Sequence, residues 1–244
     1  GAGFGVVGCG GRGRAEDVAG LGQVGTHRGR RGGRCAGLDL VGRLLQAQGR
    51  VLPMAAVPLA IEADVSGLDP AHPEAVQVVR GQAQVAVTPG TVERVRLVPA
   101  APPGCPESVA AIRSADWVVL GPGSWFTSVM THLLVPEVRE ALEVTRARRL
   151  LILNLDPGSG ETAGFSAERH LETFAELAPN LHLDVVLADP AVVDDPEQLE
   201  AACARLGATL FVAPVGRRDR AGEHDPLRFA AAVRDIVTTP RPAR

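Results

Sequence analysis

Lysine and tyrosine are both absent from the 244-residue chain, so its 25 basic residues are all arginines. Without lysine the protein cannot form a Schiff base or use the lysine of a Walker-type phosphate loop. Aromatic residues make up only 3% of the chain, which leaves few side chains for stacking on bases, and the net charge is −3. Both features argue against a nucleic-acid partner.

Long apolar runs and paired cysteines are missing as well. No apolar stretch reaches the roughly 18–20 residues that span a bilayer, and no signal peptide is visible. Four scattered cysteines, Cys9, Cys35, Cys105 and Cys203, form no metal-ligand spacing and are too few for a disulfide scaffold. We therefore expect a reduced, cytoplasmic protein that needs neither a membrane nor a cofactor.

Residues 1–37 differ in composition from the rest of the chain. They hold 14 of the 28 glycines and six arginines against two acids. Such a segment cannot offset its ordering entropy by burying apolar side chains, so we expect it to be disordered and to add no strand to the main sheet. Its sequence GCGGRG, Gly8–Gly13, matches G-x-G-x-x-G, but glycines interrupt the helix that a dinucleotide loop requires.

The remaining chain shows regular patterns. Apolar spacing and turn residues predict a helix over 38–48, an extended segment over 50–65, strands over 75–87 and 91–99 joined by Pro-Gly, and a helix over 106–115. Four apolar runs follow, at 117–120, 150–155, 183–188 and 209–215. Each precedes a helical pattern, at 125–135 and beyond Pro136, 167–178, 196–207 and 225–237. Unalternated apolar runs are typical of strands buried on both faces, which predicts a doubly wound α/β domain with a parallel sheet.

The first candidate ligand loop is GPGSWFTS, residues 121–128, at the carboxyl end of the strand over 117–120. Ligands of open parallel sheets bind at this edge. Glycines allow close approach of a ligand, and the unpaired N–H groups of the following helix start suit phosphate. Ser124, Thr127 and Ser128 add hydroxyl groups. The alternative is a tight turn in which Ser124 only caps the helix.

The second candidate loop, NLDPGSGETAGFS, covers residues 154–166 at the end of the next strand. Asn154 could contact a base or sugar edge, and Glu161 and Thr162 could contact hydroxyl groups. The alternative is again structural, with Asp-Pro-Gly as a turn and Ser166 as a helix N-cap. Two such loops on neighbouring strands favour a ligand site over two coincidental turns.

Other polar residues are assigned structural roles. His132 is interpreted as a surface or core residue and His170 as part of a solvated helix face. Asp189, Asp194 and Asp195 resemble a metal site, but Asp-Pro pairs are more typical of turns and caps. We assign no catalytic and no metal-ligating residue.

The stretches ADWVVLGPGSWFTSVMTHLLVPEVREAL and GETAGFS, together with LDVVLAD and DPLRFAAAVRDI, resemble the gluconeogenesis factor family. This is the YvcK branch of the CofD-like proteins related to 2-phospho-L-lactate transferase. The resemblance implies a three-layer Rossmann-like α/β fold over residues 38–240 with a small β-hairpin region. It also implies ligand contacts at Gly121, Gly123, Ser124, Thr127, Ser128, Asn154, Gly160, Glu161 and Thr162.

Departures from the family pattern affect these expectations. The glycine-rich GGGTG-type opening loop is absent, and Gly158 stands where the family usually has Gln. We therefore expect residues 38–240 to form only part of the family domain, preceded by a truncated or out-of-frame segment. Such a domain would bind its ligand weakly or not at all, and it would expose a sheet edge that favours homo-oligomers.

The family resemblance implies a regulatory protein that binds a UDP-sugar such as UDP-N-acetylglucosamine and is linked to cell-wall morphogenesis and gluconeogenic growth. The alternative is an enzyme, a CofD-like transferase that moves a phosphate-linked group such as phospholactate onto a deazaflavin. A third interpretation is a chain without a function of its own.

Overall fold

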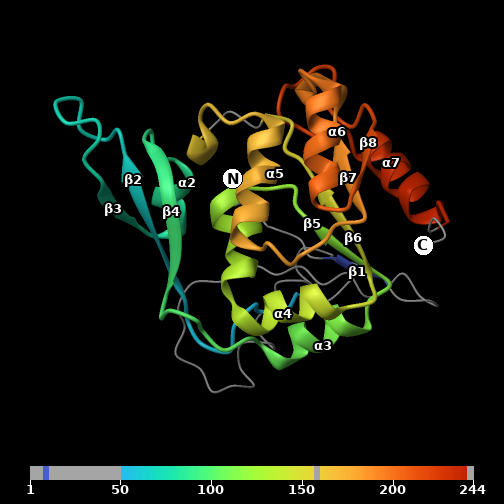
Figure 1. The fold of residues 1–244 in the computed structure, drawn as a ribbon, viewed down its shortest axis with the longest axis horizontal. Coiled ribbons are helices and arrows are strands. Elements are labelled where there is room, and N and C mark those ends of the chain that lie inside the picture. The colour runs from blue at the N-terminus through green and yellow to red at the C-terminus, as the bar shows by residue number, and fades with distance from the viewer. Residues whose placement is uncertain (1–7, 11–50, 157–159, 241–244) are drawn as a thin grey trace.

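The computed structural model describes residues 8–10, 51–156 and 160–240. The helix expected over 38–48 lies outside these ranges. Two sheets form the described part (Figure 1). The five strands of the larger sheet are β1 (Gly8–Gly10), β5 (Trp117–Leu120), β6 (Arg148–Ile152), β7 (Val185–Ala188) and β8 (Thr209–Val212), in this spatial order. The smaller sheet has the order β3 (Gln77–Arg80), β2 (Ala60–Ser66), β4 (Thr91–Val98).

Strands β5 to β8 are parallel, as the unalternated apolar runs predict. The α-helices of the described ranges are α2 (Gln82–Ala86), α3 (Pro106–Ser114), α4 (Pro136–Val144), α5 (Ala167–Leu177), α6 (Pro196–Arg205) and α7 (Pro226–Thr238). Shorter turns are η1 (Trp125–Val129), η2 (Met130–Leu134), η3 (Gly160–Thr162) and η4 (Pro190–Val192).

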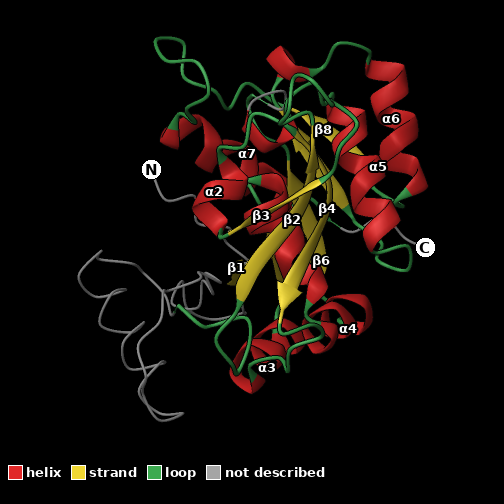
Figure 2. Ribbon diagram, turned by 90° about the vertical axis from the view of Figure 1, so that its left-hand side faces the viewer, coloured by secondary structure: helices red, strands yellow, loops and turns green. Residues whose placement is uncertain are grey.

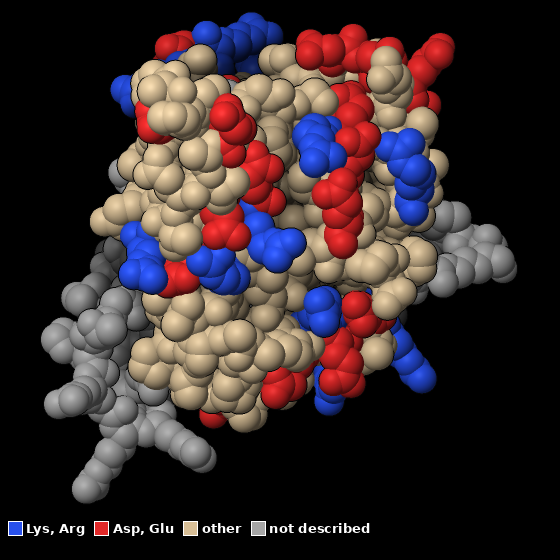
Figure 3. All heavy atoms as spheres, turned by 60° about the vertical axis from the view of Figure 1, so that its left-hand side comes forward, with Lys and Arg blue, Asp and Glu red and all other residues tan. Residues whose placement is uncertain are grey.

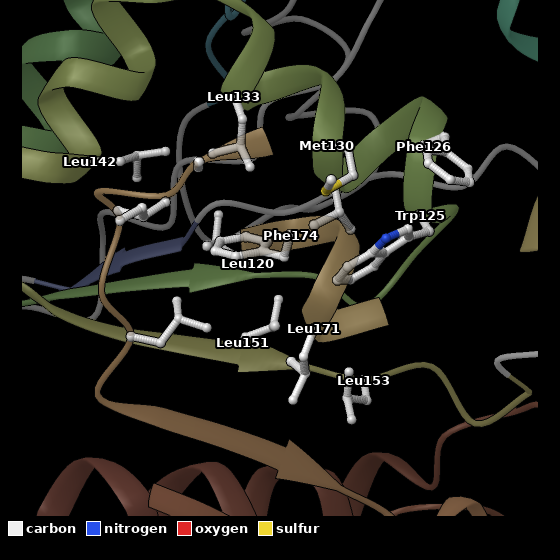
Figure 4. Packing of buried hydrophobic residues seen from close by; sticks show 14 of the residues in the cluster. Leu120, Trp125, Phe126, Met130, Leu133, Leu142, Leu151, Leu153, Leu171 and Phe174 are labelled. Carbon is white, nitrogen blue, oxygen red and sulfur yellow. The ribbon is translucent and has the colours of Figure 1, made fainter. Parts of the chain in front are cut away.

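The large sheet is the middle of three layers, which confirms the expected Rossmann-like α/β fold. Alternate residues of β6 face opposite sides, since Leu151 belongs to one buried cluster and Leu150 and Ile152 to the other. Helices α5 and α6 cover the first face, where Trp125 and Phe174 pack near β5 and β6 (Figure 4). Helix α7 covers the second face (Figure 1).

The small antiparallel sheet stands beside this sandwich (Figure 1) and lies in front of it in the view turned by 90° (Figure 2). It packs through β4 and α2 against η1, η2 and η3. Arg80 and Arg96 both pair with Glu62 on the sheet. Arginine and acidic side chains are interspersed on the face of the molecule shown in Figure 3. Exposed pairs contribute only about 0–1 kcal/mol each, so the apolar contacts provide most of the stability of this sheet.

Strand β1 contradicts the expectation that residues 1–37 add no strand to the main sheet. Gly8, Cys9 and Gly10 pair antiparallel with Val119, Val118 and Trp117 of β5. The prediction was based on side-chain burial. Strand pairing, however, uses backbone N–H and C=O groups, which glycine supplies as other residues do, and β5 would otherwise leave these groups unpaired at a sheet edge.

Residues 82–86 form helix α2 and do not continue the strand expected over 75–87. Gly81, with φ of 96°, separates β3 from α2. Alanine and glutamine are good helix formers, and only Val85 of the helix is buried, so no inward face requires a strand here.

The segment 125–134 is helical but not an α-helix. Residues 125–129 form a π-turn and residues 130–134 a 3₁₀ turn. The N–H groups of Ser128 and Val129 both donate to the Ser124 carbonyl, at 2.9 and 3.1 Å. Apolar spacing cannot distinguish these tighter and wider turns from an α-helix, because all of them bring one face to the core.

Candidate functional site

Both predicted loops border one cavity of about 460 Å³ at the carboxyl ends of β5 and β6. Six of the nine predicted ligand contacts line it, namely Gly123, Ser124, Asn154, Gly160, Glu161 and Thr162. The other three are buried residues of the first loop and do not line the cavity. Thr127 and Ser128 are 1% and 4% exposed, and Gly121 follows β5 directly. The topology therefore brings together residues that are more than 30 positions apart in the sequence.

Gly121 allows the first loop to approach the end of β6 closely. Its φ is +76°, and a Cβ atom there would lie 2.7 Å from the carbonyl oxygen of Ile152. Only glycine combines this backbone conformation with this approach. Ser124 stands at the start of η1 without making a side-chain capping bond, so its hydroxyl is not committed as the N-cap acceptor that the turn interpretation requires.

Asn154 joins the two loops. Its Nδ2 donates to the Gly123 carbonyl at 2.9 Å, and its Oδ1 accepts from the Gly123 N–H at 3.0 Å. The side-chain amide thus pairs with a backbone peptide as a neighbouring strand would. This gives Asn154 a positioning role, and its direct contact with a base or sugar remains a prediction.

Glu161 occupies the start of η1, where the sequence predicted a phosphate. Its Oε1 accepts from the N–H groups of Phe126 at 2.8 Å and Thr127 at 3.3 Å. These two amides are therefore not the unpaired donors that were expected, and this part of the prediction is wrong. Burial raises the pKa of the Glu161 carboxyl group, while the N–H groups of Thr127 and Phe126 and the Thr127 hydroxyl oppose that rise.

His224 also lines the cavity, and the sequence reasoning missed it. Gly216 pairs with His224 across a short loop after β8, and the imidazole packs edge-on to Phe229 with ring centroids 5.1 Å apart. Its Nε2 is buried and has no hydrogen-bond partner among the described residues. Burial lowers the pKa of His224, while the charge of Asp189 opposes this. The signal for it was available, since residues 213–225 form a third loop at the carboxyl edge of the same sheet.

Asp189 holds the loop that carries His224. Its carboxylate accepts from the N–H groups of Ala191 at 2.9 Å, Val215 at 2.8 Å and Gly216 at 2.7 Å. Asp189 and Asp195 are also the N-caps of η4 and α6. The cap interpretation is confirmed for both residues.

His170 is 1% exposed, so its assignment to a solvated helix face was wrong. Positions 167, 170, 171 and 174 form the buried stripe of α5, a spacing visible in the sequence. The imidazole packs edge-on to Trp125, with centroids 4.7 Å apart, and Nδ1 donates to the Ser166 carbonyl at 2.8 Å. His170 thus supports the buried Trp125 next to the cavity.

We expect His170 to make the fold less stable in mild acid. Burial lowers its pKa from the ordinary 6.5. Between this lowered pKa and pH 6.5, the unfolded chain therefore binds more protons than the folded chain. The stability that the neutral His170 contributes is then fully present above pH 6.5, and this contribution is lost as the pH falls toward the lowered pKa. Replacing His170→Asn keeps an N–H near Nδ1 and should reduce the drop in melting temperature between about pH 7.5 and 5.5.

The control is His182→Asn at an exposed position, which should leave the pH dependence unchanged. Equal pH dependence in the wild type and His170→Asn would contradict the prediction. Calorimetric melting at both pH values measures it.

The fold and the cavity define a Rossmann-like α/β protein with a ligand site at the carboxyl edge of its parallel strands. Residues 28–208 match the family model of 2-phospho-L-lactate transferase CofD, so the chain belongs to the CofD family, as its motifs predicted. No helix within the described ranges has the length and apolar character to cross a membrane.

Relatives from several bacteria are named as gluconeogenesis factors. The chain is 49% identical over 201 residues to one from Mycobacterium leprae, covering 81% of this chain and 55% of the relative. It is 50% identical over 202 residues to one from Mycobacterium tuberculosis, covering 81% and 58%. The Bacillus subtilis gluconeogenesis factor is 28% identical over 153 residues, covering 63% and 46%. The chain therefore spans little more than half the length of its mycobacterial relatives.

Solved structures agree with the fold. A crystal structure of a protein from Bacillus halodurans superposes with a TM-score of 0.65 at 23% identity, covering 82% of this chain and 66% of that one. A second structure, of a UPF0052 family member from the same organism, gives a TM-score of 0.64. At this identity the likeness concerns the fold alone.

Proposed function

We propose that this protein is a gluconeogenesis factor of the YvcK type that binds a UDP-sugar such as UDP-N-acetylglucosamine. In this role it is a cytoplasmic regulator of cell-wall morphogenesis during gluconeogenic growth. The convergence of two glycine- and hydroxyl-rich loops on one cavity carries the proposal. A volume of about 460 Å³ lies within the range of roughly 300–1,000 Å³ that small-molecule sites have.

The chemistry of the cavity supports a ligand with both phosphate and hydroxyl groups. Ser124 and His224 offer a hydroxyl and an imidazole nitrogen to phosphate oxygens, and Glu161 offers a carboxylate to hydroxyl groups. The amides of Phe126 and Thr127 are bonded to Glu161, so the diphosphate would lie on the Ser124 and His224 side. The name gluconeogenesis factor, which the relatives carry, supports the link to gluconeogenic growth.

Ligand-observed saturation-transfer NMR with UDP-N-acetylglucosamine tests the proposal, because it detects weak as well as tight binding. UDP and inorganic phosphate serve as separate ligands. Binding of the intact UDP-sugar without turnover over hours supports a regulator. No saturation transfer to UDP-N-acetylglucosamine would contradict it, whether or not UDP or phosphate binds.

Ser124→Asp should weaken UDP-N-acetylglucosamine binding by about tenfold or more, because a carboxylate near the diphosphate costs a few kcal/mol at short range. Stability should change little, since aspartate is a good residue at a helix start and the Ser124 side chain makes no capping bond.

Ser166→Asp is the matched control. Ser166 caps α5 by accepting from the Arg169 N–H and does not line the cavity. This variant adds the same charge at a helix start and should bind like the wild type. Equal affinities of both variants, measured by NMR titration, would return residues 121–128 to their interpretation as a plain turn.

The alternative is a CofD-like transferase of a phosphate-linked group. The family model itself favours it, as do two cavity side chains, Glu161 and His224, whose pKa values burial displaces, a feature common in catalytic sites. Formation of a coupled product from a nucleotide-activated phospholactate and a deazaflavin, detected by mass spectrometry, would favour this enzyme over the regulator.

A further inference from the structure

Glu161 has a feature that phosphate binding does not explain. The residue is 4% exposed and lines the cavity. Oxygen Oε1 accepts two backbone N–H bonds, while Oε2 has no hydrogen-bond partner among the described residues. A buried carboxylate oxygen without a donor is unfavourable. The Thr127 hydroxyl also acts on this carboxyl group, but it makes no hydrogen bond to Oε2, so this oxygen can take a donor from outside the described ranges.

The sign of the charge limits what this donor can be. A phosphate group carries only acceptor oxygens and negative charge at neutral pH, so it is repelled by the carboxylate. A hydroxyl group can donate to Oε2 in a charge-assisted hydrogen bond, which is stronger than a neutral one. The two bonds from Phe126 and Thr127 hold the other oxygen and thereby fix the direction of Oε2.

We propose that Glu161 Oε2 accepts a hydrogen bond from a hydroxyl group of the bound nucleotide sugar and so selects the orientation of the ligand. This rests on the proposed UDP-sugar function. One hydroxyl-bearing ring of the ligand, the ribose or the sugar, lies against Glu161, and the diphosphate lies toward Ser124 and His224, which line the same cavity. Glu161 is then a specificity-determining residue for hydroxylated ligands and excludes phosphate from the start of η1.

Glu161→Gln is the sharpest test. The amide oxygen can accept the bonds from Phe126 and Thr127, so the loop keeps its anchor, while an uncharged donor replaces Oε2. We expect binding of UDP-N-acetylglucosamine to weaken about tenfold, because the charge-assisted bond is lost. Inorganic pyrophosphate, which has no sugar hydroxyl, should bind equally well or more tightly, because the repulsion is gone.

This opposite response separates recognition from structural damage, because a disturbed loop would weaken both ligands. Loss of both, or equal affinity of the wild type and Glu161→Gln for UDP-N-acetylglucosamine, overturns the role of Glu161. Failure of the wild type to bind UDP-N-acetylglucosamine overturns both this role and the proposed function. The outcomes therefore distinguish the two proposals.

Ligand analogues provide a further test, whose first part uses only the wild type and so does not depend on the folding of a variant. Deoxy analogues of UDP-N-acetylglucosamine, each lacking one ribose or sugar hydroxyl, are titrated into the wild type. One of them should lose about tenfold in affinity, and Glu161→Gln should be insensitive to the same deletion. A wild type that tolerates every single deletion overturns the proposal.

Discussion

Gly121→Ala is expected to lower the melting temperature by about 5–15 °C. A non-glycine residue in the left-handed region costs roughly 1–2 kcal/mol, and Gly121 has φ of +76°. The new Cβ atom would also lie 2.7 Å from the Ile152 carbonyl oxygen, so backbone must shift. Overpacking of this kind adds about 1–3 kcal/mol. Because Asn154 follows this part of β6, binding of UDP-N-acetylglucosamine should weaken too.

Gly164→Ala is the control that separates the cost of backbone strain from the cost of a steric clash. Gly164 has φ of +81°, and a methyl group added there would meet no heavy atom within 4 Å. This variant therefore carries the backbone strain alone and should cost about 1 kcal/mol. Differential scanning calorimetry compares the two. Equal losses would mean that the approach of the first loop to Ile152 is not what requires glycine at position 121.

Arg149→Ala is the second substitution with a large expected effect, about 3–5 kcal/mol of unfolding free energy, because buried carbonyl groups lose their donors. Arg149 lies in strand β6 and is only 7% exposed, which is unusual for an arginine. Its guanidinium donates to the carbonyls of Leu142 at 2.7 Å and of Glu143 and Thr145 at 3.0 Å each, at the end of α4. It thereby satisfies helix carbonyls that have no intrahelical partner.

Two further variants sharpen this prediction. Arg149→Lys keeps the charge but lacks the planar fork of donors, so its stability should lie between those of the wild type and Arg149→Ala. Arg146→Ala removes an exposed arginine from the same connection and should cost less than about 0.5 kcal/mol. Urea denaturation measures all three. A loss for Arg146→Ala as large as that for Arg149→Ala would rule out the carbonyl contacts as the cause.

Much of the large sheet was predictable because its signals are local. Apolar runs predicted β5 to β8, and the amphipathic patterns predicted α4 to α7. The caps at Ser166 and Asp195 were equally readable, since each bonds a backbone N–H three residues ahead. The position of the two loops followed from one topological rule, that parallel strands end at a common edge.

Errors arose where a distant partner outweighs a local pattern. Pairing with β5 brings Gly8–Gly10 into the sheet although the glycine-rich sequence around them did not predict a strand. Packing against Trp125 buries His170, and the loop after β8 brings His224 to the cavity. Each outcome depends on a segment far away in the sequence, which spacing within one element does not report.

The sequence by itself determined the fold class, the family and the two loops that border the cavity, because apolar periodicity, glycine and hydroxyl content are properties of short segments. Only the tertiary structure decided how those loops are used. Glu161 reaches back 35 residues to the Phe126 N–H, and Asn154 reaches back 31 residues to Gly123. Hydrogen-bonding capacity belongs to a residue type, but its partner is set by which strands lie side by side. The start of η1 therefore holds a carboxylate of the protein where the local pattern had predicted a phosphate.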